Sequence, residues 1–425
     1  MIRPHRIVGW LLGVVLALPA AALASPLVFE SPSGPLTLRE IAGFKSWAQA
    51  FHPDADNQGD AWAFGHSGQA LEALGLMYEA TGDRDFLDRM IEIAGVGLAE
   101  RNDLAPAPVG HRPLWPGIST PAWGNEAPGS AGAGHAGPET GDAAGKIAYA
   151  AYLILKTPGL DGVAVPDGDP GQFGKTYGER ARTFVRLLDA TEDQFILAWF
   201  VRKDDGDRFY YPKDRRYIQA LGNERNNAGN AVPWNQQFMI DCGLQRLAQC
   251  HELLRDDPAR IALYDACVRA SLSWMLQSVT SHRDLGGHGV YYTWSYAADD
   301  AKHVEDSVHA GLDLEGLYRC YLSGRYAIVL NRSHLQAFAN EVADVMSLGG
   351  GRFAGIVDGN AKGGHAVSTD FPRPDVLVVL EFRPDVFPAI AQAAMAAKRT
   401  AGDPTAVSHL LWVKYRLTQN LATAP

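Results

Sequence analysis

The sequence has few cysteines, no excess of positive charge and, beyond its first residues, no long apolar run. Four cysteines in 425 residues are too few for a disulfide scaffold. The chain has 38 Lys and Arg against 48 Asp and Glu, a formal charge of −10. This balance argues against nucleic acid and anionic membranes as partners, because both select basic faces. No later stretch reaches the roughly 18 apolar residues of a membrane span, so we expect none.

The first residues have the pattern of an export signal. M-I-R-P-H-R is basic, Ile7 to Leu18 is apolar, and Ala22-Leu23-Ala24 forms an A-x-A cleavage site before Ser25. We therefore predict a signal peptide over 1–24 and a periplasmic or secreted mature chain. No long Pro, Ser and Gly linker divides residues 25–425, so a single domain is the simpler expectation. Loss of the two arginines in the signal changes the formal charge to 36 − 48 = −12.

The cysteines leave two alternatives open. Cys242 and Cys250 lie eight residues apart on one predicted helix, a separation of roughly 12 Å that excludes a bond between them. A bridge from Cys250 to Cys267 would cross a helical hairpin. The alternative is that these cysteines are buried free thiols.

The main pattern along the chain is a series of helical hairpins. Residues 67–80 have one apolar helical face, T-G-D-R at 81–84 supplies a stop and a restart, and a second helix begins at Phe86. The same pattern recurs over 235–254 with a second helix through Trp274, and over 306–322 with a second helix over 333–347. Further members are predicted at 145–155 and 405–420.

Long Gly-, Pro- and aromatic-rich segments separate these hairpins at 101–142, 203–234, 281–305 and 349–385. A repeat of about 60 to 80 residues is typical of repeat architectures. The pattern resembles the (α/α) toroid of polysaccharide-degrading enzymes. We therefore expect an all-α fold, an (α/α)6 or (α/α)7 toroid with its long loops on one face. An open helical solenoid is the alternative.

The predicted loops carry side chains that suit sugars. Aromatic rings offer apolar contact to a sugar face, while amides and imidazoles bond hydroxyl groups. Rim packing of the rings and turn or capping roles for the Asn residues are the alternatives. The candidate substrate-binding residues are Trp62, His66, Arg225, Asn226, Asn227, Trp234, Asn235, Trp294 and Glu305.

Residues 291–310 bring an aromatic arm next to a helix start. In an extended Y-Y-T-W-S-Y arm, Tyr292, Trp294 and Tyr296 point to one side. Asp306 or Ser307 would cap the helix that follows, and acids there favour its N-terminal dipole. His309 would then lie in the first turn, facing the same way as Asp313.

Three chemistries compete for these residues. A metal site would use His303, Glu305, Asp306 and His309, but their spacing matches no H-E-x-x-H pattern. Residues 52–60 are similar to a calcium loop, yet Gly65 stands where the terminal Glu is required. Hydrolysis would use two carboxyls about 5 to 10 Å apart, drawn from Glu224, Glu305, Asp306 and Asp313. β-Elimination in a uronate polymer would use a base, an acid and a group that neutralises the sugar carboxylate, with no metal or organic cofactor.

The tyrosine arm followed by an E-D-x-x-H-A helix start resembles the toroid polysaccharide lyases that cleave alginate or glucuronan by a Tyr/His mechanism. The toroid pattern covers most of the mature chain, and the motif covers about 20 residues from 290 to 310. The chain lacks an N-N-H-R-Y-W-type signature, and N-E-R-N-N at 223–227 is only a loose counterpart. This departure leaves the neutralising residues open.

The resemblance implies roles for residues already named. Tyr296 or Tyr292 would be the proton-transferring phenol, and His309 a second base or an orienting group. Asn226, Asn227 or Asn235 would neutralise the substrate carboxylate, and His66 would join from across the ring. The implied partner is an anionic polysaccharide. A hydrolase acting on a neutral glycan and a non-catalytic periplasmic glycan-binding protein are the alternatives.

Overall fold

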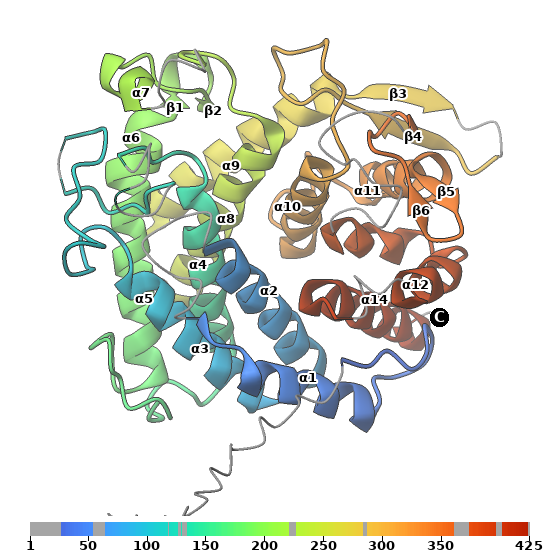
Figure 1. The fold of residues 1–425 in the computed structure, drawn as a ribbon, viewed down its shortest axis with the longest axis horizontal. Helices are drawn as coiled ribbons and strands as arrows, with labels where there is room; N and C mark the ends of the chain where they lie inside the picture. Colours follow the sequence, from blue (N-terminus) through green and yellow to red (C-terminus); the bar gives the residue numbers. More distant parts are fainter. Residues whose placement is uncertain are drawn as a thin grey trace, which may run out of the picture.

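The computed structural model describes residues 27–53, 64–117, 119–125, 129, 134–220, 227–283, 287–360, 374–396 and 402–423. In this part of the chain six helical elements form an inner ring, in which each packs on the next and the last packs on the first (Figure 1). In ring order they are α2 (Phe64–Thr81), α4 (Thr140–Lys156), α8 (Trp234–Leu254), α10 (His309–Ser323), η5 (Pro374–Phe382) and α14 (Pro404–Thr423).

A second layer of helices surrounds this ring (Figure 1). Its members are α1 (Leu38–Ala50), α3 (Arg84–Ala99), α5 (Tyr177–Thr191), α9 (Pro258–Ser278), α11 (Arg332–Asn340) and α12 (Phe387–Ala396). Outer and inner elements alternate along the chain, so the inner elements run parallel and their N-terminal ends share one face. The first and last described helices meet where buried Lys414 of α14 pairs with buried Glu40 of α1 at 2.8 Å. The described residues thus confirm an all-α toroid of six hairpins, and an open solenoid is wrong.

Short irregular elements lie between the long helices. Helix α5 continues through a π-helical segment (Glu192–Ile196) into α6 (Leu197–Trp199), and α11 continues into another (Glu341–Met346). Three antiparallel pairs of strands lie in the loops (Figure 1). They are β1 (Val201–Arg202) with β2 (Arg208–Phe209), β3 (Thr280–Arg283) with β4 (Val290–Thr293), and β5 (Ser347–Gly349) with β6 (Arg352–Phe353). A 3-10 turn (Lys203–Asp205) and α7 (Arg215–Ala220) complete the 200–233 loop.

The inner helices approach closely because small residues face one another. A Cβ on Gly145 of α4 would lie 3.0 Å from the backbone nitrogen of Gly243 of α8. Buried alanines on the same helix, such as Ala144 and Ala148, leave equally little side chain between the backbones. In two outer helices a side-chain cap instead fixes the residue at which the helix begins. Thr37 and Glu40 form a capping box that starts α1, and Asp83 caps α3.

Several predicted boundaries need correction. Helix α8 begins at Trp234 after Pro233, so Asn235 lies inside its first turn and does not cap it. Residues 374–382, placed by the sequence in a long loop, form the buried inner element η5. The outer helices α1 and α5 were not predicted.

All four cysteines are buried free thiols, so the Cys250–Cys267 bridge is wrong. Burial raises the pKa of the Cys242 thiol to about 12, so it stays protonated at neutral pH. Among the described residues, no helix is both long and apolar enough to cross a bilayer. The predicted signal peptide over 1–24 lies outside those residues.

Candidate functional site

The long loops precede the inner elements and therefore gather at the N-terminal face of the ring. The segments before α4, α8, α10 and η5 all lead into this face. A cavity of about 380 Å³ opens there beside the start of α10. Its lining consists of Tyr296, Lys302, His303, Val304, Glu305, Asp306, His309 and Ile356.

Tyr296 and His309 meet in this cavity. Their ring centroids lie 5.2 Å apart with the planes tilted by 53°. Tyr296 is half-buried, and the His309 side chain is 24 % exposed. The structure therefore brings together the phenol and the imidazole that the sequence singled out.

The chain from β4 to α10 folds back on itself to hold Tyr296 in place. The N–H of Tyr296 donates to the carbonyl of His303 at 2.8 Å, and the N–H of Glu305 donates to the carbonyl of Trp294 at 2.9 Å. The carbonyl of Tyr296 accepts from the N–H of Trp234 at 3.2 Å, at the start of α8. Backbone bonds thus fix the phenol between two neighbouring inner helices.

Asp306 lies in the turn before α10 and holds the His309 ring. Its Oδ1 accepts from the backbone N–H groups of Val308 and His309 at 2.9 and 3.0 Å. The N-cap position of α10 is Val308, which makes no side-chain cap bond, so Asp306 holds the turn before the helix and is not the cap that the sequence predicted. Its Oδ2 lies 2.8 Å from His309 Nδ1. Burial alone would raise the pKa of Asp306, but hydrogen bonds from His309 and the backbone outweigh it and lower this pKa. An ionised carboxylate at Nδ1 makes that nitrogen the donor, so Nε2 is the basic nitrogen of the neutral ring.

Behind this pair, Glu305 and Asp313 form a buried carboxyl pair. Both are fully buried, and Trp294 Nε1–H donates to Asp313 Oδ2 at 2.8 Å. Burial raises the pKa of Glu305 well above its usual range and that of Asp313 to about 7. Their mutual interaction raises the pKa of Glu305 and lowers that of Asp313, as a shared proton between two carboxyls does. At neutral pH the pair therefore carries at most about one negative charge.

Three predicted aromatic residues lie elsewhere. Trp294 is buried against Phe338, at 5.2 Å between ring centroids. Trp234 is fully buried against Trp274. Both are core residues, so the prediction that they stack on a sugar does not fit the structure. Tyr292, half-buried on Phe338, does not line the cavity with Tyr296.

The predicted amides are also separate from this cavity. Asn227 is half-buried in a turn, where its carbonyl accepts from the N–H of Asn230 at 3.0 Å. Asn235 is 5 % exposed, and its Oδ1 has no partner among the described groups. Trp62, Arg225 and Asn226 lie outside the described residues, as does the side chain of His66. So does most of the 52–60 segment.

The carboxyl groups here come close enough together to hold a cation. Glu305, Asp306 and His309 each place one ligand atom within 4.8 Å of the others. His303 does not join them, because it is 75 % exposed and pairs with Asp300 at 2.5 Å. The bonds from His309 and the backbone to Asp306, and the proton shared by Glu305, already account for this arrangement.

The segment around Ile356 also contributes to the site, and the sequence did not predict this. This segment covers the cavity through backbone bonds from Val357 N–H to Glu305 and from Ser307 N–H to Gly355, both at 3.0 Å. The contact joins segments about fifty residues apart, and no local pattern marks it. Lys302, also in the lining, is an exposed cation of the kind a polyanion needs.

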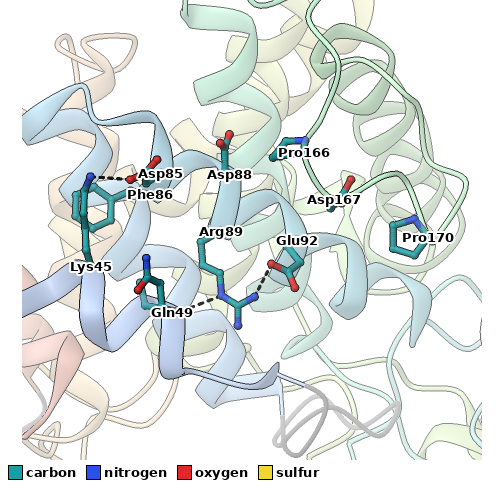
Figure 2. Close-up of a pocket in the computed structure, with 11 residues that line it drawn as sticks. Lys45, Gln49, Asp85, Phe86, Asp88, Arg89, Glu92, Pro166, Asp167 and Pro170 are labelled. Atoms are coloured by element: carbon teal, nitrogen blue, oxygen red, sulfur yellow. Dashed lines mark hydrogen bonds and ion pairs between the residues drawn. The ribbon is translucent and has the colours of Figure 1, made fainter. Parts of the chain in front are cut away.

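A second cavity of about 390 Å³ lies in the outer layer, between α1, α3 and residues 166–170 (Figure 2). Two pairs of its charged groups contact each other. Lys45 contacts Asp85 at 2.7 Å, and Arg89 contacts Glu92 at 2.5 Å (Figure 2). Because α1 and α3 are outer helices, this cavity is separate from the Tyr296–His309 site.

No family model matches the chain. No curated protein matches it either. Among solved structures, it is similar to one described as a glycosyl hydrolase family 88 protein from Bacteroides vulgatus, with 11% sequence identity and a TM-score of 0.39. That likeness covers 90% of this chain and 99% of the other.

Proposed function

We propose that this chain is an exported glycan-processing enzyme that cleaves a uronate-containing polysaccharide, of the alginate or glucuronan type, by β-elimination. The observation that carries the proposal is the Tyr296–His309 pair in the cavity at the N-terminal face of the ring. A carboxylate holds the imidazole from behind, and Lys302 stands at the same cavity. The predicted signal over 1–24 supports a periplasmic or secreted location.

The proposed reaction assigns one proton transfer to each ring. His309 Nε2 takes the proton from C5 of the uronate, and the C4–O4 bond breaks as the C4=C5 double bond forms. The Tyr296 hydroxyl gives its proton to the departing O4, and exchange with solvent restores both groups. Such positioned proton transfers typically contribute about 10²- to 10⁴-fold each. Lys302 would neutralise the substrate carboxylate, which makes the C5 proton more acidic.

The carboxyls of this cavity are less suited to hydrolysis. Glu305 is fully buried, while Asp306 already accepts bonds from His309 and two backbone N–H groups. Two-carboxyl hydrolysis needs an acid and a base that both face the scissile bond. The described groups therefore favour elimination over hydrolysis here.

A screen of anionic polysaccharides tests the proposal. Elimination creates an unsaturated uronate, so ultraviolet absorbance should rise with alginate, glucuronan or a related polymer. The rise should vanish in Tyr296→Phe, while Tyr292→Phe, on the same arm but outside the cavity, should retain it. Reducing sugar released without a rise in absorbance would indicate the hydrolase. Binding without product from any polymer would indicate the non-catalytic glycan-binding protein.

A further inference from the structure

The opposite end of the ring contains a second polar cavity. It has a volume of about 160 Å³ and is lined from the C-terminal halves of α2, α4, α8 and α10 and from α14. We call it the C-terminal pocket. Its charged lining residues are the cations Lys156, Arg246, Arg319 and Arg416 and the carboxylate Glu79.

The cations in and beneath this pocket outnumber the carboxylates that pair with them. Glu72, just beneath it, contacts Lys146 at 3.1 Å and Arg246 at 2.9 Å, and it also contacts Arg319. One carboxylate thus serves three cations. Burial raises the pKa of Glu315, the other partner of Lys146, to about 8, so it adds little negative charge at neutral pH. The ion pairs of this network join five cations to four carboxylates: Lys146, Lys156, Arg246, Arg319 and Arg416 to Glu72, Glu79, Glu315 and Glu381.

Two buried groups in the lining lack hydrogen-bond partners. Arg319 contacts Glu72, but its Nε–H has no acceptor among the described groups, and the residue is 4 % exposed. Gln245 is 2 % exposed, and its Oε1 has no partner there either. An unpaired buried polar group destabilises the folded state, and a charged one does so more strongly. A ligand oxygen that accepts from Arg319 and a hydroxyl or water that donates to Gln245 would satisfy both.

The guanidinium groups are also held in place. The Arg246 guanidinium carbon lies 4.0 Å from the Tyr149 ring centroid, and that of Arg319 lies 5.5 Å from it. The Tyr149 hydroxyl in turn donates to Glu79 at 2.5 Å. A Cβ on Gly75 would lie 2.1 Å from the Tyr149 ring, so the glycine is what lets the ring sit there. Guanidinium groups fixed in this way recognise oxyanions with little loss of side-chain entropy.

We propose that the C-terminal pocket binds a small oxyanion, a carboxylate or a phosphate, at the end of the ring away from the Tyr296–His309 cavity. The excess of cations supplies the attraction, and the unpaired Arg319 Nε–H supplies a donor. The site does not depend on the proposed elimination. A sugar acid and inorganic phosphate share the chemistry that this pocket would recognise.

Calorimetric titration of the full chain with phosphate and, separately, with glucuronate tests this site. Ionic strength is matched with chloride, so that screening is constant. We expect saturable binding of at least one anion, weakened about tenfold by Arg416→Gln, because the variant removes one charge-assisted bond to the anion. Lys156→Gln, at a half-exposed position, provides a second variant of the lining. Arg182→Gln, an exposed arginine paired with Asp161 on the outer layer, is the control and should change binding less than twofold.

Each outcome of this titration either supports the anion site or overturns it. Phosphate alone would indicate an inorganic or phosphorylated ligand, and glucuronate alone would indicate a sugar acid. The absence of saturable binding for both anions would overturn the site. So would binding that survives both Arg416→Gln and Lys156→Gln unchanged. Glucuronate binding that is lost in His309→Ala but kept in both pocket variants would place that anion in the other cavity.

Discussion

The two ends of the inner ring carry opposite chemistry. At the N-terminal ends of the parallel helices lie Asp306, Glu305 and Asp313, with the Tyr296–His309 cavity above them. At the C-terminal ends lie four cations in a smaller pocket. A helix dipole favours acids near its N-terminus and bases near its C-terminus, and Asp306 before α10 and Lys156 at the end of α4 lie at such positions.

The two ends also differ in how their side chains are held. The arginine pocket is built on the helices themselves, and ion pairs beneath it fix its groups. The Tyr296–His309 cavity is instead assembled from the loop after β4, the start of α10 and the segment around Ile356. We therefore expect substitutions at the loop end to change activity most, and substitutions beneath the arginine pocket to change stability most.

The largest expected effect is at the loop end. Tyr296→Phe and His309→Ala should each lower the elimination rate by about 10²- to 10⁴-fold, because each removes one positioned proton transfer. Initial rates from ultraviolet absorbance, together with unchanged circular dichroism, would show this. The matched phenol Tyr292→Phe should stay within about twofold. Equal losses in Tyr292→Phe and Tyr296→Phe would contradict the assignment.

The next effect concerns stability beneath the arginine pocket. Glu72→Gln should lower the free energy of unfolding by about 3 to 5 kcal/mol, because it leaves buried cations without their shared carboxylate. Denaturant titration measures this change. Asp161→Asn, which breaks the exposed pair with Arg182, should cost about 0 to 1 kcal/mol. A similar small cost for Glu72→Gln would mean that the buried network contributes little.

The third effect is a pH dependence that arises at the loop end. Burial raises the pKa of Asp313 to about 7, so the folded state keeps a proton that the unfolded chain loses near pH 4. This contribution to stability is complete below about pH 4 and is lost as the pH rises to about 7, at most about 1.4 kcal/mol per pH unit. Glu315, with a pKa raised to about 8, adds a parallel loss through its buried pair with Lys146. Unfolding measured from pH 4 to 8 should therefore show a shallower decline in Asp313→Asn than in the wild type, and identical slopes would contradict the carboxyl pair.

The smallest effect separates the two roles of Asp306. Asp306→Ala should cost about 1 kcal/mol of stability through the lost bonds from the N–H groups of Val308 and His309, whereas Asp306→Asn should keep most of them. Both variants should also lower the elimination rate, by less than His309→Ala does, because the imidazole remains but no charge holds its protonated Nδ1. If Asp306→Asn retained full activity, the carboxylate would have no part in orienting the imidazole.

The long inner helices could be predicted from the sequence, whereas the short inner element η5 and the outer helices α1 and α5 could not. The predicted and observed ranges of α2, α8 and α10 agree closely. The V-L-V-V-L run of η5 is buried all round and has no polar face to reveal a helical period. The burial of Trp234 and Trp294 near the site could not be predicted from the sequence either. The sequence places them beside loops, but only long-range packing determines that both point into the core.

Proton magnetic resonance of the oligosaccharides released from a uronate polymer tests the central claim most directly. Elimination leaves a C4=C5 double bond, so the product should show an olefinic H4 signal that grows with new chain ends. The wild type should produce this signal, and Tyr296→Phe should not. New reducing ends without an olefinic signal would contradict the account and assign hydrolysis to this toroid.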